Sequence, residues 1–145
     1  MSAYSELFIN DAMETFGEAF EYAVNNLKLC GQEFLDIFSH GHIGEAFSRG
    51  DIRYIAGMSG IELAKVVLKE YPITQECKNY ELSIGYPPEY WCGWILAYYQ
   101  WYSGETFFDI CKRISYKNLM NLYGVLHEVD ISKAVSVLNQ FDEGM

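Results

Sequence analysis

The sequence predicts an all-α fold: one compact domain over residues 1–145, with six to eight helices around a central aromatic helix. Three observations indicate this fold. Apolar residues recur at steps of three and four over residues 9–27, as on one face of an amphipathic helix. Residues 88–103 follow a proline and precede a glycine, the usual punctuation of a helix. Half of the 145 residues are hydrophobic and 17% are aromatic, which is enough to build a core at this length.

The first helix is expected over residues 9–27, with Gly31 as its stop. Its apolar stripe consists of Ile9, Met13, Phe16, Phe20, Ala23 and Leu27. At 100° per residue, one arc opposite that stripe carries four acids, and we expect them to face solvent: Asp11, Glu14, Glu18 and Glu21. The segment 1–27 contains five acids and no base, so the first helix presents a ladder of carboxylates.

Two short helices are expected next, around residues 33–38 and 43–49. The sequence Ser59-Gly60-Ile61-Glu62 is then typical of a capping box, because a serine at the N-cap and a glutamate three residues later satisfy each other's backbone amides. This helix is expected to end at Pro72. Residues 72–86 follow as an irregular loop, in which residues 80–84 alternate weakly, as in a short strand, but have no apparent partner strand.

The central element is expected to be the segment 88–103, which holds all three tryptophans of the chain. A helix that is apolar nearly all round is covered by its neighbours. Tyrosine hydroxyls need water or a hydrogen-bond partner, so the edge that bears Tyr98, Tyr99 or Tyr102 is expected to reach the surface.

Three further helices are expected after the central one, over residues 106–114, 115–123 and 130–141. Ser115 and Asp130 are good N-cap residues, and Gly124 is the expected stop of the second of these helices.

The charge of the chain excludes some classes of partner. Twenty acidic residues against ten basic ones give a formal net charge of −10. Such a surface repels phosphate, so neither nucleic acid nor an anionic membrane is an expected partner. The first residues lack a basic leader, and the longest uncharged stretch, 90–104, is too short to span a bilayer. A cytoplasmic protein with four reduced thiols is therefore expected, at Cys30, Cys77, Cys92 and Cys111.

No catalytic, cofactor-binding or metal-binding residue is predicted, and no cofactor is expected. The Trp91-Cys92-Gly93 run lacks the second cysteine of a redox site. The glutamate ladder lacks the Glu-x-x-His motif of di-iron bundles, and the three histidines have no zinc-ligand spacing. Nucleophile-elbow and phosphate-loop motifs are missing from the sequence as well. Together these observations favour a protein that is not an enzyme.

The run Pro88-Glu89-Tyr90-Trp91-Cys92-Gly93-Trp94-Ile95-Leu96-Ala97-Tyr98-Tyr99-Gln100-Trp101-Tyr102 resembles a family of small, uncharacterised bacterial proteins. The resemblance extends to residues 123–133 and weakly to 11–13 and 59–64. Such proteins are encoded beside genes for toxins that look like ADP-ribosyltransferases. The resemblance therefore implies an antitoxin, immunity or accessory role.

The leading hypothesis for function is a non-enzymatic, protein-binding domain, an antitoxin-like or regulatory partner of another bacterial protein such as a toxin. Its expected partner-binding residues are the four acids Asp11, Glu14, Glu18 and Glu21 and the tyrosines Tyr98, Tyr99 and Tyr102. One alternative is a small-molecule-binding protein or enzyme, with a pocket between the aromatic helix and the loop 72–86. Another is an acidic DNA-mimic inhibitor, whose carboxylates imitate phosphates.

Overall fold

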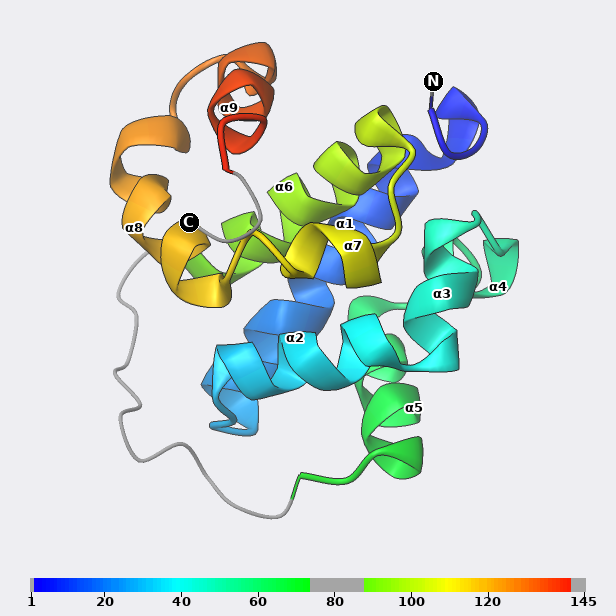
Figure 1. Cartoon of the computed structure of the whole chain (residues 1–145). Coiled ribbons are helices and arrows are strands. Elements are labelled where there is room, and N and C mark those ends of the chain that lie inside the picture. Colours follow the sequence, from blue (N-terminus) through cyan, green and yellow to red (C-terminus); the bar gives the residue numbers. More distant parts are fainter. Residues whose placement is uncertain (1, 74–87, 142–145) are drawn as a thin grey trace.

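The computed structural model describes residues 2–73 and 88–141, and the regular elements in these residues are all helices (Figure 1). The all-α prediction is therefore confirmed for the described residues. The elements are a 3₁₀ turn Glu6–Phe8, α1 Ile9–Glu21, a π-helical turn Tyr22–Asn26, α2 Gly31–His40, α3 His42–Ser48, α4 Ile52–Ile55, α5 Gly60–Glu70, α6 Pro88–Ser103, α7 Phe107–Cys111, α8 Tyr116–Leu126 and α9 Ile131–Leu138. The predicted loop 72–86 lies almost entirely outside these residues.

The first helical segment ends close to the predicted residue 27, but the stop signal differs from the prediction. The helix continues through the π turn and stops at Lys28, whose φ of 59° lies in the left-handed region. Gly31, the predicted stop, instead begins α2 after an extended Cys30. The reversal thus occurs three residues earlier, at a non-glycine position that local sequence rules do not favour.

Two other helix signals have opposite outcomes. The predicted capping box is confirmed: Ser59 Oγ accepts a hydrogen bond from the amide of Glu62, and the glutamate accepts one from the Ser59 amide. Gly124 does not stop α8, which continues to Leu126. A β-carbon at Gly124 would meet no atom within 4 Å, so this glycine lies on an open helix face.

The helix α6 is the centre of the fold, as the sequence predicts, and α1 packs along its length (Figure 1). The pair is antiparallel, because the amide of Ala3 donates to the carbonyl of Trp101 whereas Gly17 lies against Tyr90. The backbones approach closely at two glycines. A β-carbon on Gly93 would overlap the carbonyl of Phe16, and one on Gly17 would lie 3.0 Å from the carbonyl oxygen of Tyr90.

Beneath this crossing, phenylalanines from four helices form the centre of the hydrophobic core. The ring centroids of Phe16 and Phe38 are 4.6 Å apart, and those of Phe16 and Phe107 are 5.0 Å apart. Offset and edge-to-face pairs of this kind stabilise a core beyond their buried area. The cluster consists of Phe16, Phe20, Phe34, Phe38, Phe47 and Phe107.

The prediction of four reduced thiols is wrong for Cys30, which is disulfide-bonded. Sequence spacing does not report which cysteines meet in space, so this bond had no local signal. Cys92 and Cys111 are free, and Cys77 lies outside the described residues. Burial raises the pKa of the Cys111 thiol to about 12 and raises that of Cys92 well above its usual value. Neither free thiol is therefore a thiolate near neutral pH.

Within residues 2–73 and 88–141, none of the helices has both the length and the apolar character that a bilayer crossing requires.

The glycine contacts predict opposite effects of one substitution at two positions. Gly93→Ala is expected to lower the free energy of unfolding by about 2–3 kcal/mol, because the new methyl group forces α6 away from Phe16. Gly124→Ala is expected to raise it by about 0.5–1 kcal/mol, since alanine is the better helix former and the space is open. Urea unfolding followed by circular dichroism measures both. Equal effects of the two variants would contradict the close crossing.

Candidate functional site

The acidic residues of α1 border a hollow of about 320 Å³ on the surface. Asp11, Glu14 and Glu18 line it from α1, Gly60 from the start of α5, and Tyr90 from α6. The hollow thus lies where three helices meet. Its walls are more polar than apolar, and its charged groups are carboxylates.

Glu18 has a structural role in this hollow that the sequence did not indicate. Its Oε1 accepts hydrogen bonds from the amides of Gly60, at 2.7 Å, and Ile61, at 3.3 Å. These amides are at the first turn of α5, where helix N–H groups lack partners within the helix and attract negative charge. The expectation that Glu18 points freely to solvent is therefore wrong: its carboxylate fastens α5 to α1.

Glu21 extends the acidic surface toward the end of α1. It lines a smaller hollow of about 140 Å³ that shares Glu18 with the first. Partial burial raises the pKa of Glu21, and the nearby carboxylates of Glu18 and Glu89 raise it further. Glu89 is 3% exposed and accepts a hydrogen bond from Asn25, on the π turn. Folding thus brings Glu21 close to like charges.

Asp11 and Glu14 remain as the unpaired acids of the predicted ladder. Both are exposed, and within the described residues neither takes part in a hydrogen bond or an ion pair. Of the four predicted acids, Glu18 therefore fastens α5 to α1 and Glu21 lies close to like charges. Asp11 and Glu14 remain exposed, without an ion pair or hydrogen bond among the described residues.

The least buried edge of α6 consists of aromatic side chains, of which Tyr102 is exposed and the other three are half-buried. Between Glu89 and Tyr102 every position of this helix is buried except those of Tyr90, Trp94, Tyr98 and Tyr102, which we call the aromatic row. Their spacing of four places them along one face of the helix. The rings of Tyr98 and Tyr102 are nearly parallel, with centroids 6.2 Å apart. Sequence reasoning named Tyr98 and Tyr102 but missed Tyr90 and Trp94, although the four-residue repeat could have indicated them.

Tyr99, the third predicted surface tyrosine, is buried at 1% exposure, so the expectation of an exposed edge there is wrong. Its hydroxyl donates to Oδ1 of Asn139 at 2.7 Å and accepts from the guanidinium of Arg113 at 2.9 Å. The polar tip that was expected to need water is thus satisfied inside the protein.

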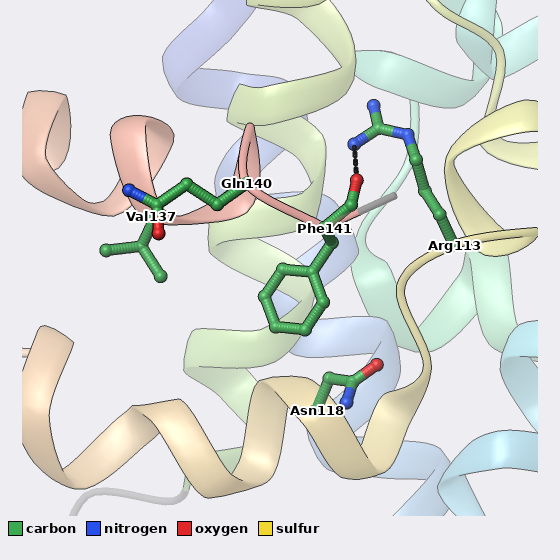
Figure 2. A pocket seen from close by; sticks show the side chains of 5 residues that line it. All are labelled: Arg113, Asn118, Val137, Gln140 and Phe141. Atoms are coloured by element: carbon green, nitrogen blue, oxygen red, sulfur yellow. Dashed lines mark hydrogen bonds between the residues drawn. The ribbon is translucent and has the colours of Figure 1, made fainter. Parts of the chain in front are cut away.

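Arg113 also borders the most voluminous of the pockets described here, about 390 Å³ between α8 and α9 (Figure 2). Figure 2 shows its guanidinium directed at the carbonyl of Phe141, at 3.2 Å, while the side chain of Asn118 lies on the opposite side of that residue. The guanidinium also forms an ion pair with Glu105. Its charge is therefore neutralised within the fold, and the pocket presents amides and apolar groups.

A further pocket, of about 270 Å³, contains a histidine and hydroxyl groups. His40 Nδ1 lies 2.8 Å from the carbonyl of Asp36, which leaves Nε2 as the exposed ring nitrogen. Ser48 Oγ donates to the Gly44 carbonyl and accepts from the Phe107 amide. Because the hydroxyl is bonded to the backbone on both sides, this arrangement does not provide an activated nucleophile.

Over residues 2–73 and 88–141, no group of three or more His, Cys, Asp or Glu side chains is arranged to hold a metal ion.

Comparison of the chain with protein-family models, with curated proteins and with solved structures finds no match. The resemblance to toxin-linked bacterial proteins consequently stays a prediction from the aromatic motif.

The cap formed by Glu18 predicts a stability effect that its neighbour does not share. Glu18→Gln is expected to lower the free energy of unfolding by about 1 kcal/mol, because an amide oxygen caps the α5 amides more weakly than a carboxylate. Glu14→Gln removes the same charge from the same helix face and is expected to change stability by less than about 0.5 kcal/mol. Thermal unfolding of both variants provides the comparison. A larger loss in Glu14→Gln would rule out the cap.

The raised pKa of Glu21 predicts a pH dependence of stability. A carboxyl with a higher pKa in the folded state binds its proton more tightly there, so its contribution to stability falls as pH rises from the usual value of 4.5 through the raised one. Glu21→Gln removes this loss. We therefore expect the variant to match the wild type at pH 4 and to exceed it at pH 7, in urea unfolding at both pH values. A variant that is less stable than the wild type at pH 7 would contradict the like-charge environment.

Proposed function

We propose that this chain is a non-enzymatic, protein-binding domain, an antitoxin-like or regulatory partner of another protein. One observation carries the proposal: Asp11 and Glu14, unpaired among the described residues, share a hollow with Tyr90, where the aromatic row of α6 begins. Charged and aromatic groups therefore adjoin on one surface. Exposed aromatic rings beside polar groups are typical of protein interfaces.

The charges indicate what kind of partner this surface favours. The chain carries a net charge of −10, and no basic residue precedes Lys28. Carboxylates on α1 would steer a basic protein toward the hollow and orient it there, an effect that acts mainly on the association rate. An ion pair on an exposed surface contributes little binding free energy. The aromatic row would therefore supply the apolar contact area that holds the partner in place.

The resemblance of the segment 88–102 to proteins encoded beside toxin genes supports a toxin as this partner. An antitoxin of this kind would act by occupying the toxin's surface, and it would need no catalytic group of its own. Of the partner-binding residues predicted from the sequence, the geometry favours Asp11, Glu14, Tyr98 and Tyr102.

A peptide titration tests the charge part of the proposal. The probe is a short synthetic peptide rich in arginine and leucine, and isothermal titration calorimetry measures its affinity for the full chain at low and at physiological salt. We expect binding to weaken with salt and to fall about 5–10-fold in the double variant Asp11→Asn, Glu14→Gln, because two unpaired carboxylates are lost.

The matched control is Glu33→Gln with Glu128→Gln, which changes the net charge equally at two exposed acids on α2 and after α8. This control is expected to change affinity less than about 2-fold. An equal loss in both double variants would mean that only net charge matters, and it would overturn the assignment of the surface.

A further inference from the structure

We infer that the pocket between α2, α3 and α7 binds a small, neutral, hydroxyl-rich molecule with the size and chemistry of a monosaccharide. The pocket has a volume of about 270 Å³, and none of its lining residues borders the acidic hollow. The inference therefore goes beyond the proposed function and does not depend on it. Its basis is the set of hydrogen-bonding groups that the pocket leaves free, together with the balance of its charges.

Hydrogen bonds within the protein hold the walls of this pocket in place. Ser48 Oγ donates to the carbonyl of Gly44 at 2.8 Å and accepts from the amide of Phe107 at 3.1 Å, which joins α3 to the start of α7. The fully buried side chain of Gln100 adds a second connection, because its amide donates to the carbonyls of Ser48 and Glu105. The pocket is therefore preformed, as small-molecule sites usually are, and a ligand needs little reorganisation of the protein.

Two side chains of the pocket keep one hydrogen-bonding function free. His40 Nδ1 lies 2.8 Å from the carbonyl of Asp36, and because a carbonyl only accepts, Nδ1 carries the proton of the neutral ring. Its Nε2 is then an acceptor, without a partner among the described residues. Thr106 Oγ1 accepts from the amide of Asp109, which leaves its hydroxyl hydrogen available to donate.

The charges around the pocket cancel in pairs. Glu45 Oε1 lies 3.4 Å from the guanidinium of Arg49, and the ammonium of Lys112 lies 3.5 Å from a carboxylate oxygen of Asp109. Lys112 also lies 4.6 Å from the ring centroid of Phe108, which lines the pocket. A position that would attract a ligand cation to this ring is thus taken by a lysine. A ligand anion would meet the carboxylate of Glu45 and the net charge of −10, so a neutral ligand is favoured.

A ring that carries several hydroxyl groups satisfies these side chains together. Because each hydroxyl both donates and accepts, one can donate to His40 Nε2, another to the carboxylate of Glu45, and a third can accept from Thr106. The C–H groups of such a ring suit the apolar wall formed by Phe108, which is 43% exposed. A purely apolar ligand would displace water from the polar groups and leave them without partners.

Titration of the ¹⁵N-labelled full chain with neutral hexoses tests the inference, with amide NMR shifts as the readout. The probes are glucose, galactose and mannose. We expect at least one of them to shift the amides of Gly41, Glu45 and Phe107, with a dissociation constant of about 0.1–10 mM. The amino sugar and the uronic acid of the same hexose keep the ring and add a charge of either sign. Both are expected to bind more weakly than the neutral hexose.

The variant His40→Phe tests the assignment of the acceptor, because it keeps a planar ring and removes Nε2. We expect it to weaken hexose binding about 3–10-fold through the loss of one hydrogen bond. The matched control is His42→Phe, at a neighbouring exposed histidine that pairs with Glu70 and does not line the pocket. This control is expected to leave the affinity unchanged.

The inference is overturned if none of the three hexoses shifts the pocket amides at about 50 mM. It is overturned as well if the amino sugar or the uronic acid binds as tightly as the neutral hexose, or more tightly, since the pocket would then not select a neutral ligand. An equal loss of affinity in His40→Phe and His42→Phe would also overturn it. None of these results bears on the surface formed by Asp11 and Glu14, which the peptide titration tests separately.

Discussion

The close backbone crossing of α1 and α6 is the constraint on which the rest of the structure depends. It requires glycine at positions 17 and 93, because a β-carbon at either site would meet the backbone of the facing helix. Next to this contact, the side chain of Phe16 packs in the phenylalanine cluster, against Phe38 and Phe107. The crossing also fixes the rotation of α6 about its axis, and thereby decides that Tyr90 and its row lie at the surface.

The same crossing determines what the acids of α1 can do. With α6 on one side and α5 on the other, only a narrow face of α1 remains open. Glu18 lies at the border with α5 and satisfies amides of its first turn, which would otherwise lack partners at a buried helix end. Asp11 and Glu14 lie nearer the start of α1 and remain unpaired among the described residues. Carboxylates that are evenly spaced in the sequence thus have two different roles: Glu18 stabilises the start of α5, whereas Asp11 and Glu14 remain at the surface.

Local patterns in the sequence predicted the helices well, because the apolar stripe of α1 and the capping box at Ser59 depend on neighbours a few residues away. The side-chain positions that were predicted wrongly depend on contacts with residues far away along the chain. Glu18 meets an amide 42 residues further along the chain, and Tyr99 meets Asn139, 40 residues away. Tyr98 and Tyr99 are adjacent and chemically identical, and it is the contact of Tyr99 with Arg113 and Asn139 on one side of α6 that separates a buried ring from a half-buried one.

The acids and the aromatic row also constrain each other. Exposed rings favour self-association, because two such rows would bury apolar area against each other. Carboxylates at the border of the row oppose that contact: a second copy would bring Asp11 and Glu14 toward their own equivalents, and like charges that lose water on contact repel strongly. The same carboxylates attract a cationic group. On the proposed function, the surface would therefore select its partner by repulsion of like charge as well as by attraction of a cationic group.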